Sequence, residues 1–198
     1  MELKNGIPAF YAKSRKGWRR WLEKNHAKEK NVWLIIHHKN AGTPSVYYDE
    51  AVEEALCYGW IDSKANKRDD QSFYQFFARR NPKSNWSGLN KRRVEKLLES
   101  GLIAPAGMEM IELAKRNGTW TALDDVEKTV IPEDMQLAFN QNGAAFTHFT
   151  AFPASVKRGI LEWIQSAKRA ETRKQRIENT IQLAEKNIRA NQYRKPQP

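Results

Sequence analysis

The sequence has a single cysteine, Cys57, among its 198 residues. One cysteine excludes an intrachain disulfide and every zinc motif that needs several thiolates. None of the four histidines stands at a recognised ligand spacing such as HExxH, and the neighbours His37 and His38 point to opposite faces of a strand. We therefore expect no metal and no cofactor, and a reduced, cytoplasmic setting.

Long apolar runs are also absent. The longest aliphatic and aromatic run is VWLII at 32–36, whereas a membrane-spanning helix needs about 20 such residues. The opening stretch MELKNGIPAFYAKSRKGW has no apolar segment of the kind that signal peptides carry. We expect a protein that does not span a membrane, and no pattern indicates an oligomeric state.

Acidic residues are few compared with basic ones. There are 23 Asp and Glu against 34 Lys and Arg, which gives a formal net charge of +11 and a pI near 9.8. This balance favours an anionic partner: a small molecule, an acidic protein or nucleic acid. A lysine-rich soluble surface explains it equally well. Seven tryptophans indicate a large aromatic core or an aromatic-lined cleft.

The hydrophobic periodicity predicts an α+β fold. Helix-like spacing over 14–25 precedes a buried strand at 32–39, and SVYY at 45–48 suggests a short second strand. A helix capped by Asp49 is predicted to stop at Gly59, where WIDSK begins another strand. SFYQFFARR at 72–80 completes a small antiparallel sheet that helices cover.

The rest of the chain is predicted to be helical. One helix is capped by Ser84, Asn85 or Ser87, and the next begins at Pro105 with Met108 facing inward. Further helices open at Pro132, at a Ser155 cap and near 171. We predict three parts: an α+β domain at 1–120, a connection at 121–131, and a helical C-terminal subdomain at 132–198 with a frayed tail.

The stretch LCYGWIDSK at 56–64 raises the question of chemistry. A nucleophilic thiol needs a base, and His37 or His38 could serve Cys57 if the strand lies nearby. The end of a helix raises a thiol pKa, however, and a small packing residue is the commoner role. An enzyme that uses Cys57 or Asp62 with a histidine remains an alternative.

A second stretch, FFARRNPKSNWSGLN at 76–90, combines arginines, a tight turn and a helix start. Helix N-termini and arginine forks both attract anions. We predict an anion- or ligand-binding cleft in which this stretch meets the tryptophan–aspartate corner. The candidate residues are Trp60, Asp62, Arg79, Arg80, Ser84, Trp86 and Asn90. A capped helix with solvated arginines, and an Asp62–arginine ion pair that only holds the fold, are the plainer interpretations.

The C-terminal segment SAKRAETRKQRIENT gathers basic residues. If it is helical, Arg169, Arg173 and Arg176 lie on one side, where they could follow a phosphate backbone. The segment has no interleaved aromatics and no recognition-helix pattern. Nucleic-acid binding through these helices is a second alternative, and a solvated face is the plainer interpretation.

The chain resembles the YdeI/OmpD-associated (OmdA-type, bacteriocin-protection) family. The resemblance rests on six stretches in family order: WRRWLEKNH at 18–26, VWLIIHHK at 32–39, YDEAVEEALCYGWIDSK at 48–64, ARRNPKSNWSGLNKRRVEKLLESGLI at 78–103, PAGMEMIELAKRNGTW at 105–120 and LEWIQSAKRAETRKQRI at 161–177. It implies a bacterial stress-tolerance protein, linked to bacteriocins or cationic peptides, and no catalytic residues. Ala78 stands where the family often has proline.

Overall fold

The computed structural model describes residues 2–192. These residues form two compact units that meet between Thr121 and Ala122 in the chain. The first unit contains β1 (Glu2–Lys4), β2 (Ile7–Tyr11), α1 (Arg15–Asn25), β3 (Asn31–His37), η1 (Lys39–Ala41), α2 (Tyr48–Cys57), β4 (Trp60–Lys67), β5 (Ser72–Arg79), α3 (Gly88–Glu99) and α4 (Pro105–Arg116). The second contains α5 (Asp124–Glu127), α6 (Glu133–Asn140), α7 (Gly143–Ala151), α8 (Ala154–Gln165) and α9 (Ala170–Glu185).

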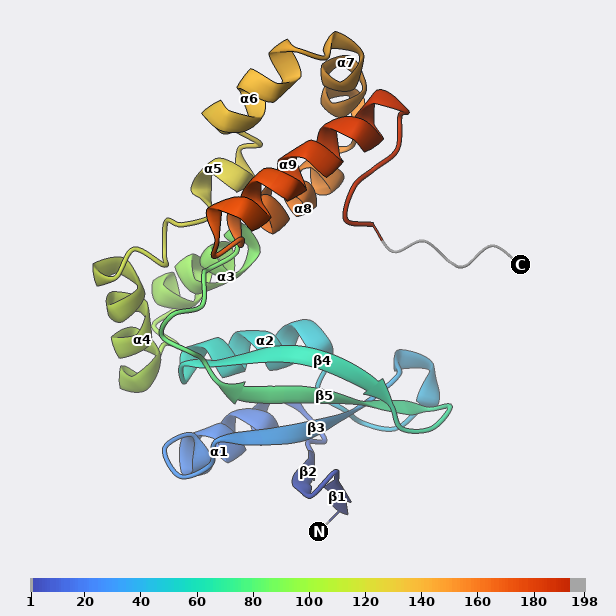
Figure 1. Cartoon of the computed structure of the whole chain (residues 1–198). Helices are drawn as coiled ribbons and strands as arrows, with labels where there is room; N and C mark the ends of the chain where they lie inside the picture. The colour runs from blue at the N-terminus through green and yellow to red at the C-terminus, as the bar shows by residue number, and fades with distance from the viewer. Residues whose placement is uncertain (1, 193–198) are drawn as a thin grey trace. The chain divides into compact units, whose positions relative to one another are not determined.

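The described part of the chain forms one five-stranded sheet in the order β1-β2-β3-β5-β4 (Figure 1). The α+β class is confirmed, but the sheet is mixed rather than antiparallel, because β2 runs parallel to β3. We missed β1 and β2 in the sequence because both are short and Pro8 interrupts the strand pattern. A register shift between Asp62 and Ala65 bulges the edge strand β4.

Helices α1 and α2 cover one face of this sheet. Trp18 and Leu22 from α1 and Leu56 from α2 share a buried cluster with Leu34 and Phe77 from the strands. The Trp18 indole donates to the Ala51 carbonyl at 3.0 Å, which ties the two helices together. The predicted 3.6-residue stripe of α1 is therefore its core face.

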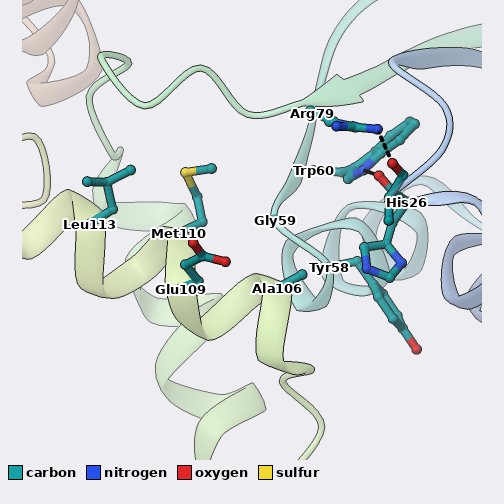
Figure 2. Close-up of a pocket in the computed structure, with 10 residues that line it drawn as sticks. His26, Tyr58, Gly59, Trp60, Arg79, Ala106, Glu109, Met110 and Leu113 are labelled. Atoms are coloured by element: carbon teal, nitrogen blue, oxygen red, sulfur yellow. Dashed lines mark hydrogen bonds between the residues drawn. The ribbon is translucent and has the colours of Figure 1, made fainter.

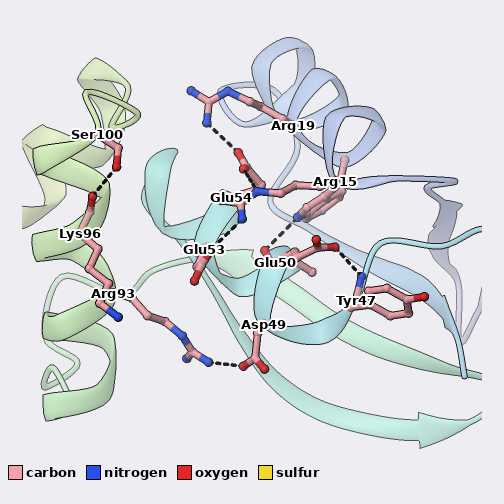
Figure 3. A network of polar contacts seen from close by, with 12 residues as sticks. Arg15, Arg19, Tyr47, Asp49, Glu50, Glu53, Glu54, Arg93, Lys96 and Ser100 are labelled. Carbon is pink, nitrogen blue, oxygen red and sulfur yellow. Dashed lines mark hydrogen bonds and ion pairs between the residues drawn. The ribbon is translucent and has the colours of Figure 1, made fainter. Parts of the chain in front are cut away.

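A buried carboxylate locks α1 to α2 (Figure 3). Glu54 is 3% exposed and accepts from Arg15 at 2.6 Å and from Arg19 at 2.7 Å, while Arg15 also reaches Glu53 at 2.8 Å. Two guanidinium groups compensate the desolvated charge. Polar groups thus join two helices whose apolar faces point to the sheet.

Three local predictions in this unit were wrong. SVYY forms no strand: residues 45–47 have no regular structure, Tyr48 begins α2, and the Val46 N–H donates to the Ala12 carbonyl at 3.1 Å. Tyr47, not Asp49, is the N-cap of α2, and its N–H donates to the Glu50 carboxylate at 3.1 Å. Met108 is 38% exposed, although Ile111 on the same helix is fully buried.

The second unit has its own core, to which α5–α9 all contribute. The predicted connection at 121–131 contains α5, whose Val126 packs into that core. We also missed α7, whose N-cap is Asn142: its Oδ1 accepts from the Ala145 N–H at 3.0 Å. Likewise α8 starts at Ala154, so Ser155 lies inside it.

The tail predicted to be frayed lies mostly outside the described residues, at 193–198. Within residues 2–192, no helix combines the length and the apolar character that crossing a membrane requires.

Candidate functional site

The start of β4 and the end of β5 bring two candidate residues together. Trp60 and Arg79 are a directly opposed cross-strand pair, and the Arg80 N–H donates to the Gly59 carbonyl at 2.9 Å. Gly59 itself has φ +71°, which an L side chain rarely adopts. The chain therefore turns sharply from α2 into β4, as the Gly59 stop in the sequence predicted.

Helix α4 closes one side of this corner. The Ala104 N–H donates to the Cys57 carbonyl at 3.0 Å, so the helix begins against the end of α2. A Cβ on Gly107 would lie 2.3 Å from that same carbonyl oxygen. Only glycine permits this approach, and it aligns Ala106, Glu109 and Met110 along the corner.

The corner is a hollow of about 260 Å³ (Figure 2). Figure 2 shows the α4 side chains on one side and those of α1's end and the two strands on the other. The lining residues are His26, Ala27, Tyr58, Gly59, Trp60, Arg79, Ala106, Glu109, Met110 and Leu113. Most of the wall is apolar, with a few polar groups that converge on it, as is usual in small-molecule sites.

Arg79 is the fixed cation of the hollow. Its Nε donates to the Glu29 carbonyl at 2.8 Å and one Nη to the Ala27 carbonyl at 2.5 Å. Within residues 2–192 no carboxylate forms an ion pair with it. The guanidinium is therefore held in place by neutral groups and keeps its charge for another partner.

His26 and Trp60 complete this side of the hollow. The His26 Nδ1 contacts the Leu22 carbonyl at 2.9 Å, and because a carbonyl only accepts, this nitrogen carries a proton. In the neutral ring, Nε2 is then an acceptor. Trp60 is 1% exposed and its indole donates to the His26 carbonyl at 3.3 Å, so it supplies wall rather than a free donor.

Comparison with known families matches two regions of the chain. Residues 10–110, about half of the sequence, match the family described as Domain of unknown function (DUF8412). Residues 128–187 match the family described as Bacteriocin-protection, YdeI or OmpD-Associated (OmdA). The chain is a DUF8412 family member with an OmdA region. No curated protein and no solved structure matches it.

The resemblance to the OmdA family is confirmed by the match at residues 128–187, a narrower part of the chain than the six stretches suggested. Of the six stretches, only LEWIQSAKRAETRKQRI lies within the OmdA region. The stretches ALCYGWIDS and RRNPKSNWS both lie in the DUF8412 region, as does most of the hollow. The candidate site therefore belongs to the DUF8412 region rather than to OmdA.

The hollow contains Trp60 and Arg79 but not the other five predicted residues. Asp62 accepts from the Tyr48 hydroxyl at 2.8 Å and from the Gln75 amide at 3.4 Å, so its expected ion pair with Arg79 or Arg80 does not form. Burial, and then this carboxylate, raise the pKa of Tyr48 to about 12. Asp62 is therefore held by neutral donors.

Arg80 and Trp86 pack against each other in the interior. The Arg80 guanidinium carbon lies 3.9 Å from the centre of the Trp86 ring, and the group donates to the Asn85 carbonyl. Arg80 is 5% exposed, and burial lowers the pKa of its guanidinium to about 10. This arginine shapes the 80–86 turn from inside rather than facing a cleft.

Ser84 and Asn90 also make local hydrogen bonds. The Ser84 hydroxyl donates to the Asn81 carbonyl at 2.7 Å, and the Asn90 side-chain oxygen accepts from Arg93 at 3.1 Å. Ser87 is the N-cap of α3, one of the three caps that the sequence offered. These residues stabilise the turn and the helix start.

The structure removes the accessible thiol that a Cys57 nucleophile requires. Cys57 is fully buried, and burial raises the pKa of its thiol to about 11. The residue is a packing element at the end of α2, as its plainer interpretation held. No group of three or more potential metal ligands occurs among residues 2–192.

The basic face of α9 is largely paired. Arg173 donates to Asp134 at 2.6 Å, and Arg176 stacks on Trp163 at 4.9 Å while donating to the Ser166 hydroxyl at 3.0 Å. These guanidinium groups are engaged within the OmdA region and its own unit. Of the three arginines predicted to follow a phosphate backbone, Arg173 and Arg176 are therefore already engaged inside the protein.

Sequence reasoning missed the α4 wall and the rim residues His26 and Tyr58. Glu109, Met110 and Leu113 recur at helical spacing and looked like the flank of an ordinary amphipathic helix. The only available signal was Gly107, a glycine inside a helix, which marks a close backbone approach.

Proposed function

We propose that the DUF8412 region binds a small anionic molecule, a carboxylate or a phosphate, in the hollow beside Arg79. The observation that carries this proposal is the guanidinium of Arg79: it is fixed by two backbone carbonyls, borders the hollow and has no ion-pair partner in the described residues. A preorganised cation loses little entropy when an anion binds.

The other residues that line the hollow restrict which ligands can bind there. Met110, Leu113 and the Trp60 ring provide apolar contact, so the ligand carries a hydrocarbon or ring beside its charged group. Glu109 contributes a negative charge, which disfavours a polyanion and favours a ligand that also bears a donor, such as an amine or hydroxyl. A volume of about 260 Å³ suits a metabolite.

We further propose that this binding serves bacteriocin or cationic-peptide tolerance in a bacterial cytoplasm. The OmdA description supports the tolerance role, and the single unpaired cysteine fits a reducing compartment. An acidic protein that covers the basic surface is a compatible partner, since the net charge is +11.

A thermal-shift screen of carboxylated and phosphorylated metabolites tests the binding proposal, with calorimetry on any hit. Ala106→Phe fills the hollow from α4 without removing a hydrogen bond, and Met108→Phe on the exposed side of the same helix is its control. We expect Ala106→Phe to lower the affinity for the hit at least about tenfold and Met108→Phe to leave the affinity unchanged. A hit that binds the Ala106→Phe protein equally well refutes the site.

Arg79→Gln tests the cation itself, with Arg92→Gln on the exposed face of α3 as the charge control. Loss of one charge-assisted contact is expected to weaken binding by about ten- to a hundredfold for Arg79→Gln only. Cells that express the wild-type or the Ala106→Phe protein can then be challenged with a cationic peptide; equal survival of the two strains counts against the tolerance role of the hollow.

A further inference from the structure

The face of the sheet opposite α1 and α2 carries a separate aromatic cluster. Its buried members are Ala9, Trp33 and Ile35. Partly buried residues of the same strands surround them: Ile7, Tyr11, Tyr74 and Phe76. All seven lie in β2, β3 or β5, and no helical residue of the described chain belongs to the cluster. This strand-only surface is called the aromatic face below.

Trp33 stands at the centre of the aromatic face between two other rings. Its ring centre lies 4.9 Å from that of Phe76 and 6.0 Å from that of Tyr74, both edge to face. Trp33 is directly opposite Phe76 in the β3–β5 register, so the rings are held by the backbone ladder. Tyr74 and Phe76 remain partly exposed and outline a platform along β5.

Two lysines lie over these rings from opposite sides. The Lys4 ammonium from β1 lies 4.7 Å from the Tyr74 ring centre, and the Lys64 ammonium from β4 lies 5.7 Å from that of Phe76. Both also lie within 5.9 Å of the Trp33 ring centre. Trp33 is only 1% exposed although no helical residue of the described chain belongs to its cluster, and the two flexible lysine side chains help to shield it.

Two ring nitrogens on this face have no hydrogen-bond partner within residues 2–192. They are the Trp33 Nε1 and the His37 Nδ1, both buried, and the two residues share one side of β3 because they are four positions apart. Unpaired buried polar atoms are rare in proteins and call for an explanation. A base edge could pair with the Trp33 nitrogen only after Lys4 and Lys64 move off the ring.

We propose that the aromatic face binds single-stranded nucleic acid. Bases would stack on Tyr74 and Phe76, while Lys4 and Lys64 move from the rings to the phosphates. Sheets with exposed aromatics bind single strands in this way, because every base has a π-face and the backbone is anionic. We infer nucleic acid as the ligand because each ring lies beside a lysine, and a single strand presents bases and phosphates in the same alternation.

Other charges on this face limit the cationic contribution to the two lysines. Arg68 pairs with Glu2 at 3.0 Å, and the Tyr74 hydroxyl donates to the same carboxylate. The negative charge of Glu2 is therefore balanced by Arg68, so that it repels a phosphate only weakly. An acidic peptide would satisfy the lysines but leave the ring surfaces unused, so it is the weaker candidate.

Fluorescence anisotropy with labelled oligothymidine and oligouridine of about 12 nucleotides tests the proposal at low salt. Tyr74→Leu and Phe76→Leu keep the apolar packing and the net charge but remove a stacking surface. We expect each to weaken binding about tenfold, whereas Tyr74→Phe, which keeps the ring, stays within about twofold. Circular dichroism of each variant verifies that it is folded.

Lys64→Gln tests the proposed contact between this lysine and a phosphate. It is expected to weaken binding and to reduce the slope of log affinity against log salt by about 0.7, the value for one phosphate contact on a single strand. Arg92→Gln removes the same charge from the exposed face of α3 and is the control for net charge. An equal effect of the two substitutions refutes a contact at Lys64.

Three results overturn the proposal: no binding at low salt, equal competition by polyglutamate, or binding that survives Tyr74→Leu and Phe76→Leu but is lost on Lys168→Gln with Arg169→Gln. The last would place the site on the basic C-terminal segment. Ala106→Phe is expected to leave oligonucleotide binding unchanged. The proposal for the aromatic face and the proposal for the hollow can therefore be refuted separately.

Discussion

At the scale of single residues, burial decides which reactive-looking groups can react. Cys57 and Arg80 are the most suggestive side chains in the two stretches that drew attention, and both lie in the interior. Arg79, one position from Arg80, points to a hollow instead. Arg79 is the last residue of β5 and Arg80 the first beyond it, and the two side chains have different surroundings.

The Cys57 thiol is expected to be inert in the folded protein. Its pKa rises from 9.0 to about 11, so the thiolate fraction at neutral pH falls about a hundredfold. Iodoacetamide at pH 7.5 should label it only after unfolding, as mass spectrometry can check. Rapid labelling of the native protein would revive the enzyme hypothesis.

The same shift has a pH consequence. Because the folded pKa lies above the unfolded one, the contribution of Cys57 to stability is present below pH 9 and is lost as the pH rises towards 11. Cys57→Ala should therefore flatten part of the alkaline decline in denaturation midpoint. An unchanged decline would mean that the thiol does not titrate in that window.

At the scale of elements, the position of α4 depends on one missing side chain. Gly107 touches the end of α2 so closely that any Cβ must push the helix away. Since α4 forms a wall of the hollow, this contact links packing to the proposed site. The periodicity of α4 predicted the helix but could not predict which face met another backbone.

Gly107→Ala is expected to destabilise the first unit by about 1–3 kcal/mol, because the clash with the Cys57 and Leu56 carbonyls cannot relax without moving α4. Gly17→Ala in α1 meets only the Ser14 hydroxyl, at 3.6 Å, and should be neutral or stabilising by up to about 1 kcal/mol. Urea midpoints measure both. Equal midpoints for the two variants would show that α4 shifts at no cost.

The elements that could be predicted from sequence are those with a strong local signal. Helix α1 has an apolar stripe, β3 contains the apolar run VWLII, and Gly59 and Gly101 follow helix ends at positive φ. Helix α7 was missed because Asn142-Gly143 is as typical of the end of a helix, here α6, as of the start of another. Of the seven candidate residues only Trp60 and Arg79 line the hollow, because strand pairing joins them, whereas α4 reaches it through tertiary packing.

At the scale of the whole molecule, each of the two units within residues 2–192 has its own large hydrophobic core. The DUF8412 match lies entirely in the first unit and the OmdA match in the second. Each core is made from residues of its own unit. A substitution in one core is therefore expected to act on that unit first.

Phe149→Ala, which empties a fully buried position on α7, should destabilise the second unit by about 3–5 kcal/mol. Phe146→Ala on the same helix removes a ring that is 37% exposed and should cost less. Hydrogen exchange should report faster exchange in α7 and α9 while β3 and β5 keep their protection. Parallel loss of protection in the strands would mean that the units unfold together.

The irregular edge strand has a further consequence for solubility. A straight outermost strand exposes a row of unpaired amides to which another polypeptide can add, and that is a common start of aggregation. In β4 the register shift at Asp62–Ala65 and the ammonium groups of Lys64 and Lys67 break up that row. A concentrated solution of this protein should accordingly resist assembly into extended fibrils through the free edge of β4.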